Sequence, residues 1–137
     1  TMTSKAIDLL DNDKGFFLMV EGSNIDVCES EQDMKGTIEQ MMAFDHTVDY
    51  VLNWAQQHQG TLVLVTADHE TGGVQIPDNA TADDINNDCF TSDGEHTNTN
   101  VLLMAGGAQS AEICSSDVID NTDIAKYMRK VLTDSHK

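Results

Sequence analysis

An acidic residue and a histidine, Asp68 and His69, stand side by side at the end of the apolar run TLVLVTA, residues 61–67. A buried strand does not need such a pair for its own packing. A carboxylate oxygen and an imidazole nitrogen are, however, common ligands of zinc. The plain alternative is that the pair only caps a following helix. Further ligands near the pair would favour the metal.

Residues of the same kind stand beside the other apolar runs. Glu21 and Asp26 follow FFLMV at residues 16–20, Glu70 follows His69, and His96 comes shortly before NVLLMAG at residues 100–106. Ligands of open α/β sheets bind beyond the carboxyl ends of the strands. We therefore expect one cluster at one edge of the sheet, made of Glu21, Asp26, Asp68, His69 and His96. Mixed nitrogen and oxygen ligands suit zinc, and oxygen-only sets suit magnesium.

The apolar runs predict the elements that position these side chains. Strands are expected at Phe16–Val20, Leu62–Thr66 and Val101–Met104, and apolar residues at steps of three and four predict a long helix over Met34–Gln57. A strand, a helix and a strand in this order form a right-handed unit with parallel strands. We therefore predict an α/β fold with at least three largely parallel strands. An amphipathic helix capped at Asn121 or Thr122 is expected near the end of the chain.

Size and charge limit the possible functions. The chain has 137 residues and a net charge of −17, from 24 acidic and 7 basic residues. This length suits a single domain, residues 1–137. The charge argues against nucleic acid and anionic membranes as partners, because both require Lys and Arg to neutralise phosphates. No apolar stretch is long enough to span a membrane. The carboxylates either solubilise the surface of an exported protein or gather cations.

Three motifs carry a family resemblance. GFFLMVEGSNID, TLVLVTADHETGG and EHT occur in this order, with the long predicted helix between the first two. Together they resemble the C-terminal part of the alkaline phosphatases, over nearly the whole chain. The resemblance implies a three-layer α/β fold with a mostly parallel sheet, hydrolysis of phosphomonoesters, and a periplasmic or extracellular location. It also implies two zinc ions and one magnesium ion.

The same resemblance implies a role for each candidate ligand. Glu21 would bind the magnesium ion. Asp26 and His96 would bind one zinc ion, and Asp68 and His69 would bind the other. In this family a serine between the zinc ions attacks the phosphomonoester, and zinc-activated water then releases the phosphate from the serine.

The chain departs from the family pattern at two points. Where the family has a zinc-binding histidine four residues after the aspartate, this chain has Ser30, a much poorer ligand. Cys28, Glu29 or Glu31 could replace the histidine only if the loop rearranged. The family's nucleophilic serine and a metal-bridging aspartate belong to an N-terminal half that we do not find in this sequence. We therefore assign no catalytic residue.

Several functional hypotheses follow from this pattern. The first is that the chain is the C-terminal portion of a metal-dependent phosphomonoester hydrolase. The alternatives are an inactive stand-alone fragment and an interaction or assembly module derived from a phosphatase.

The helical pattern of the first residues, without a signal peptide, leads us to expect a chain that begins partway through a longer protein. We expect self-association, for example as a homodimer, and no hydrolysis by this chain alone. Cys89 and Cys114 could pair in an oxidising compartment.

Overall fold

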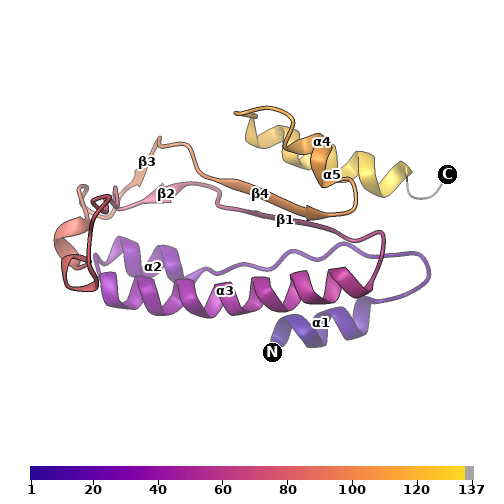
Figure 1. Cartoon of the computed structure of the whole chain (residues 1–137), viewed down its shortest axis with the longest axis horizontal. Helices are drawn as coiled ribbons and strands as arrows, with labels where there is room; N and C mark the ends of the chain where they lie inside the picture. The colour runs from indigo at the N-terminus through magenta and orange to yellow at the C-terminus, as the bar shows by residue number, and fades with distance from the viewer. Residues whose placement is uncertain (135–137) are drawn as a thin grey trace. The chain divides into compact units, whose positions relative to one another are not determined.

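The structure, a computed structural model, describes residues 1–134. Three helices come first along the chain, four short strands with two 3-10 turns between them follow, and two helices come last (Figure 1). Their order is α1 (Met2–Leu10), α2 (Asn24–Ser30), α3 (Met34–Gln57), β1 (Leu62–Thr66), β2 (Glu70–Thr71), η1 (Ala82–Asp84), η2 (Asn87–Cys89), β3 (His96–Thr97), β4 (Leu103–Gly107), α4 (Ser110–Ile113) and α5 (Asn121–Asp134). Within the described residues, none of these helices combines the length and the apolar character needed to cross a membrane.

The chain divides into two compact units. The first contains Thr1–Tyr50 and His69–Thr99, and the second contains Val51–Asp68 and the chain from Asn100 onward. Helix α3 supplies residues to both units. The expectation of one domain over residues 1–137 stays a prediction.

In the first unit, side chains tie the helix starts to neighbouring loops. Thr1 and Ser4 form a capping box at the start of α1, and Ile7 of that helix is buried. The predicted helix over Met34–Gln57 is confirmed with the same bounds. The backbone N–H of Met34 donates to Oδ1 of Asn87 at 3.0 Å. Because this N–H lies in the first turn and has no partner within the helix, the distant loop satisfies it.

The loop between β2 and β3 packs closely against the end of α2. Gly94 has φ = +76°, and a Cβ atom there would collide with the backbone carbonyl oxygen of Ser30. Only glycine accommodates both the left-handed backbone and this close approach. The side-chain amide of Gln32 donates to the carbonyl oxygen of Ser92 at 2.6 Å. The loop before β3 is thereby held against the turn that joins α2 to α3.

The second unit is built on the antiparallel pair β1–β4, which run side by side in Figure 1. Ile113, Tyr127 and Val131 form its buried core. Partly buried apolar residues of the strands and helices pack against that core, namely Leu62, Leu64, Leu103, Ala105, Ile119 and Ile124. On the other face of the pair, Leu52 of α3 approaches Gly106, where a Cβ atom would lie 3.4 Å from Leu52 Cδ2. The two-stranded sheet therefore packs against residues on both of its faces.

Helices α4 and α5 are joined by polar contacts. The Tyr127 hydroxyl donates to the carbonyl oxygen of Gln109, and Lys130 pairs with Glu112. The predicted terminal helix is present, but its cap is Asp120. Its Oδ1 atom accepts from the Thr122 backbone N–H at 2.9 Å. Asn121 is already helical, so the cap lies one residue before the first of the two predicted positions.

The prediction of largely parallel strands is wrong for the strands that form. Strand Leu62–Thr66 has the predicted bounds, but its partner is antiparallel and spans Leu103–Gly107 instead of Val101–Met104. A parallel pair requires a crossover connection, usually a helix. The segment between β1 and β4 instead runs out through β2 and returns through β3, with only 3-10 turns between them. The chain remains a mixture of helices and strands, which is the coarser part of the expected α/β fold.

The predicted strand Phe16–Val20 is not formed. The segment has no regular secondary structure, and Phe17 and Met19 are 55% and 76% exposed. An apolar run becomes a strand only when a neighbouring strand accepts its hydrogen bonds. Within the described residues, β1 pairs with β4 and β2 pairs with β3, and neither pair includes this segment.

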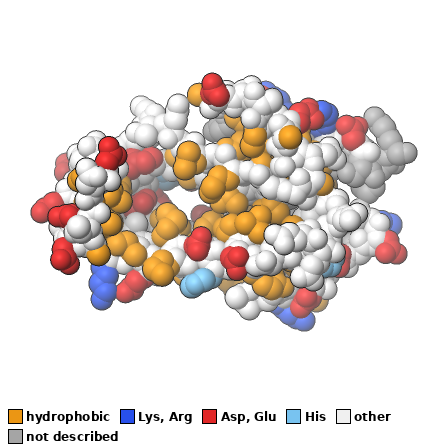
Figure 2. Space-filling view, in the orientation of Figure 1, with side chains coloured by type: hydrophobic (Ala, Val, Ile, Leu, Met, Phe, Trp, Pro, Cys, Tyr) orange, Lys and Arg blue, Asp and Glu red, His pale blue; other side chains and the backbone are white. Residues whose placement is uncertain are grey.

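The surface is acidic, with apolar side chains among the charges. Figure 2 shows Asp and Glu side chains scattered over the face in view, with hydrophobic groups between them. Met2, Leu102 and Val118 are among the exposed apolar residues. All three cysteines are free thiols, so the possible Cys89–Cys114 pair is not formed.

Candidate metal centre

The first unit brings two histidines together through the pairing of β2 with β3. Thr71 of β2 lies opposite His96 of β3 in the antiparallel register. His69 directly precedes β2, and its ring stacks on that of His96 with centroids 3.5 Å apart and planes 20° apart. Two segments separated by a long loop thus place two imidazoles side by side.

Helix α2 adds a carboxylate to this pair. The helix contacts β2, and its residue Asp26 faces the strand. The distance from Asp26 Oδ1 to His96 Nε2 is 3.7 Å. The hydroxyl of Thr71 donates to the same Asp26 oxygen at 2.6 Å and lies 3.1 Å from His69 Nδ1. Asp26, His69 and His96 therefore meet around one buried threonine.

These three residues can offer one metal-ligand atom each. The ligand atoms of Asp26, His69 and His96 all lie within 4.8 Å of one another. Two imidazole nitrogens and one carboxylate oxygen form a set that catalytic zinc sites use. Asp26 and His69 are half-buried, while His96 is exposed, so the cluster is open to solvent on one side. The residues present fit a zinc ion with room for a further ligand.

Glu70 orders the loop that carries His69. Its carboxylate accepts from the backbone N–H groups of Val74 at 2.9 Å and Gly73 at 3.3 Å, and from the Thr97 hydroxyl. The register places Glu70 opposite Thr97. By sequence this acidic residue could be a metal ligand, but in the structure it joins the two ends of the β2–β3 loop.

Negative charge gathers next to the cluster. The pKa of Glu29 is raised above its usual value, mainly by burial and then by the neighbouring carboxylates of Glu70 and Asp26. The nearby His69 acts in the opposite direction. Neighbouring carboxylates disfavour each other's ionisation, and a cation beside them would offset this repulsion.

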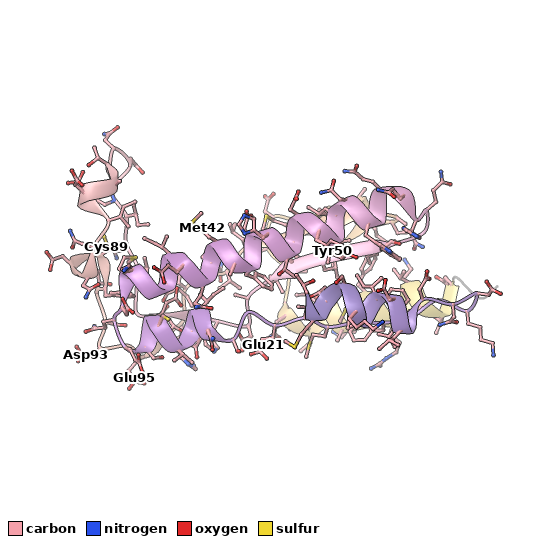
Figure 3. The ribbon with its side chains drawn as sticks, turned by 90° about the horizontal axis from the view of Figure 1, so that it is seen from below. Glu21, Met42, Tyr50, Cys89, Asp93 and Glu95 are labelled. Carbon is pink, nitrogen blue, oxygen red and sulfur yellow. The ribbon has the colours of Figure 1, made fainter. Side chains whose placement is uncertain are left out.

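Two predicted ligands do not belong to this group. Glu21 lies on the segment that leads into α2, and Figure 3 shows it beyond one end of that helix, while Glu95, the neighbour of His96, lies towards the other end. Asp68 falls in the second compact unit. The roles of Glu21 at a magnesium ion and of Asp68 at a second zinc ion stay predictions.

The substitution at Ser30 is not compensated in this arrangement. Within residues 1–134, the group of ligand atoms contains neither Cys28, Glu29 nor Glu31. The carbonyl of Ser30 instead lines the space beside Gly94. The three residues that cluster are among those expected from the sequence, whereas Thr71 is not, because its only signal is its position two residues after His69.

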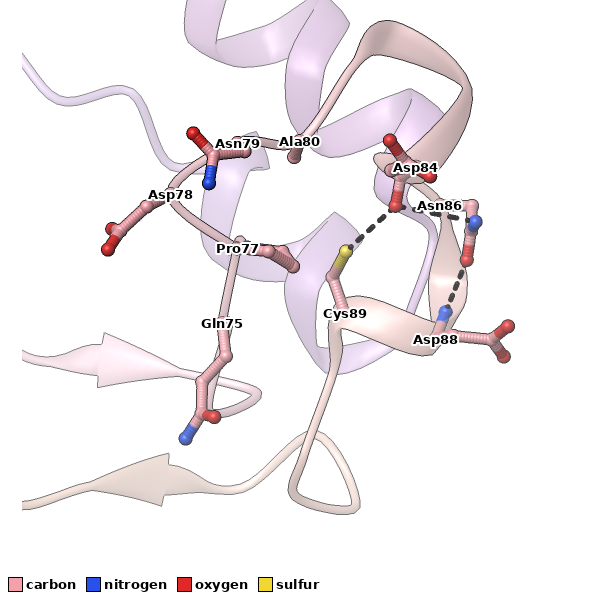
Figure 4. Close-up of a pocket in the computed structure, with 9 residues that line it drawn as sticks. All are labelled: Gln75, Pro77, Asp78, Asn79, Ala80, Asp84, Asn86, Asp88 and Cys89. Carbon is pink, nitrogen blue, oxygen red and sulfur yellow. Dashed lines mark hydrogen bonds between the residues drawn. The ribbon is translucent and has the colours of Figure 1, made fainter.

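A hollow in the same unit is lined by several acidic residues, but the described residues there form no such cluster. It is lined by Gln75, Pro77, Asp78, Asn79, Ala80, Asp84, Asn86, Asp88 and Cys89. Figure 4 shows the carboxylates of Asp78, Asp84 and Asp88 pointing in different directions. Among the residues that the structure describes, these three do not form a metal-ligand group.

Comparisons with known proteins agree with the family resemblance. The family model of alkaline phosphatases matches residues 1–88. The chain is 35% identical to alkaline phosphatase H of Pseudomonas aeruginosa, over 96% of this chain and 30% of that protein. It is 32% identical to the alkaline phosphatase of Escherichia coli, over 96% of this chain and 31% of that protein. It is 45% identical to alkaline phosphatase 3 of Bacillus subtilis, over 55% of this chain and 16% of that protein.

The chain matches only part of the length of these relatives. The chain spans 30% and 31% of the lengths of the first two relatives. No solved structure matches the chain. The family match covers well over half of the 137 residues and includes Asp26, Asp68 and His69. The chain belongs to the alkaline phosphatase family.

Proposed function

We propose that this chain supplies metal-binding residues to a phosphomonoester hydrolase of the alkaline phosphatase type. The observation that carries the proposal is the meeting of Asp26, His69 and His96, whose ligand atoms lie within 4.8 Å of one another. These residues come from the three motifs that resemble the family. They lie far apart in the sequence, and the fold nevertheless brings them to one place.

Asp26, His69 and His96 would hold a zinc ion through one carboxylate oxygen and two imidazole nitrogens. Such an ion would act as a Lewis acid that polarises a phosphoryl oxygen and lowers the pKa of bound water. Asp26 is held by Thr71, and Glu70 fixes the loop on which His69 stands. The exposed side of His96 leaves the cluster open to a phosphate group.

The second zinc ion and the magnesium ion extend this proposal. Asp68 would bind the second zinc ion, and Glu21 would bind the magnesium ion. The nucleophilic serine and the bridging aspartate of the family lie outside these 137 residues. We therefore propose that the chain alone binds zinc without hydrolysing phosphomonoesters above background, since no group positions an attacking oxygen in line with the leaving group.

The exposed apolar segment Phe16–Val20 supports a larger assembly. In this segment Phe17 and Met19 are exposed, while Phe16 and Leu18 are half-buried. This alternation suits a β-strand. We propose that the segment becomes a strand of the family's three-layer sheet when the rest of that fold is present. Without it, the same surface favours self-association, for example as a homodimer. A periplasmic or extracellular location would follow from the family.

The activity proposal is tested with p-nitrophenyl phosphate at alkaline pH, with added zinc and magnesium. The 137-residue chain is expected to show the same background rate as its His69→Ala variant. Zinc binding, measured separately by competition with a chromophoric chelator, should be present in the wild type and lost in the variant. Turnover that disappears in His69→Ala would show that the chain holds a complete active site and would contradict the proposal.

A further inference from the structure

Thr71 occupies a position that neither the motifs nor the family roles assigned. Thr71 is only 2% exposed and lies in β2 opposite His96. Its single hydroxyl contacts two of the three clustered ligands, Asp26 at 2.6 Å and His69 at 3.1 Å. A buried hydroxyl with two ligand side chains as neighbours can influence both of them.

The proton count at this hydroxyl decides the direction of both hydrogen bonds. A hydroxyl has one proton to donate, and a carboxylate can only accept. The 2.6 Å contact with Asp26 Oδ1 has the short length of a charge-assisted O–H···O bond. The proton of Thr71 therefore points to Asp26. The 3.1 Å contact with His69 then requires that Nδ1 carries a proton and donates it to a lone pair of Thr71.

We propose that Thr71 is a positioning residue that orients Asp26 and fixes the Nδ1-protonated form of His69, so that His69 offers Nε2 to a metal. The part of the proposal that concerns metal affinity rests on the proposed function. The tautomer of His69 does not, because it follows from the contacts of the Thr71 hydroxyl. The arrangement matches the general behaviour of metal-binding histidines, whose second nitrogen is held by a hydrogen-bond partner.

The orientation of Asp26 follows from the same contact. Asp26 Oδ1 lies 3.7 Å from His96 Nε2, beyond hydrogen-bond distance, and receives the Thr71 proton at 2.6 Å. The threonine thus holds the carboxylate from the strand side. The entropy of fixing this side chain is lost during folding, so a metal ion would meet a carboxylate that is already oriented.

The first test measures the tautomer directly. Long-range ¹H–¹⁵N correlation spectra of the metal-free wild-type chain, with His69→Gln to assign the signal, should show His69 protonated at Nδ1. In Thr71→Val, which has nearly the same shape and no hydroxyl, the preference for Nδ1 should weaken. A wild-type His69 protonated only at Nε2 would overturn the proposal. This measurement needs no variant of Thr71 to fold.

The second test measures zinc affinity with a competing chelator. Loss of a group that orients a metal ligand typically weakens metal binding about 10–100-fold, and Thr71→Val should show a loss of this size. Thr71→Ser keeps the hydroxyl and should restore most of the affinity. Thr47→Val on α3 is the matched control for the same substitution outside the cluster, and should bind zinc as the wild type does.

Equal zinc affinity of Thr71→Val and Thr71→Ser, with both variants folded by circular dichroism, would overturn the positioning role. If the wild-type chain itself bound no zinc, the proposed function would fail instead. The tautomer spectrum would still decide whether Thr71 acts on His69. The two proposals are therefore separately falsifiable.

Discussion

The unit that carries the candidate metal centre buries three threonines, whereas the unit built on β1–β4 buries a connected set of apolar side chains. Thr3, Thr37 and Thr71, the buried polar residues, all lie in the first unit. Ile113, Tyr127 and Val131 form the core of the second. Hydrogen bonds are directional and hold side chains at defined positions. Apolar packing stabilises the folded state in proportion to the apolar area that it buries. The first unit also buries the apolar residues Ile7, Met34 and Cys89, so its threonines add directional contacts to apolar burial, while the buried residues described in the second unit are all hydrophobic.

The comparison predicts the largest loss of stability for a core substitution in the second unit. Ile113→Ala removes a side chain that is 7% exposed and should lower the free energy of unfolding by about 2–5 kcal/mol. Val118→Ala, at a residue that is 70% exposed, is the control and should change it by less than about 0.5 kcal/mol. Urea denaturation followed by circular dichroism measures both. Equal effects of the two substitutions would show that the apolar cluster is not the core of this unit.

A smaller effect is expected at a glycine in the first unit. Gly94→Ala places a Cβ against the Ser30 carbonyl and should destabilise the fold by about 1–3 kcal/mol. Gly15→Ala is a matched control, because Gly15 has nearly the same φ, +75°, and no atom within 4 Å of the added Cβ. Thermal unfolding of the two variants isolates the cost of the close approach. If Gly15→Ala were as destabilising as Gly94→Ala, the close contact between the loop and α2 would not explain the loss of stability.

The smallest expected loss of stability is at Tyr127 in the second unit, and it depends on alkaline pH. Burial, and then Glu112, raises the pKa of Tyr127 above its ordinary value. The neutral phenol is therefore favoured in the folded state. The stability that this neutral phenol adds is complete below about pH 10, the pKa of tyrosine in the unfolded state. It is lost as the pH rises through the higher pKa of Tyr127 in the folded state.

Tyr127→Phe should be less stable than the wild type at neutral pH, by about 1 kcal/mol, because the bond to the Gln109 carbonyl is lost. The difference should shrink as pH rises above about 10, since phenylalanine does not titrate. Urea denaturation at several pH values gives the comparison. A difference that is constant up to strongly alkaline pH would contradict the assignment.

The same contrast explains which parts of the fold could be predicted. Helix α3 and strand β1 have the predicted bounds, because apolar periodicity and an uninterrupted apolar run are local signals. The direction of β4 could not be read locally, since it depends on how the chain returns through β3. Phe16–Val20 has the composition of a strand, but composition does not supply a partner strand.

The candidate site shows the same limit. Asp26, His69 and His96 were identified because carboxylate and imidazole side chains have metal chemistry wherever they stand. Their division between two zinc ions came from the family resemblance, whereas the structure groups all three. Thr71 could not be identified, because threonine is common in strands and its role depends on the β2–β3 register and on the position of α2.

The central claim is that Asp26, His69 and His96 together form a metal site. It is tested most directly by diffraction from zinc-loaded crystals of the chain at wavelengths on both sides of the zinc absorption edge. The account predicts an anomalous peak at bonding distance, about 2.0–2.2 Å, from nitrogen or oxygen atoms of all three residues. A zinc ion bound by other residues while this cluster carries no anomalous peak would contradict it.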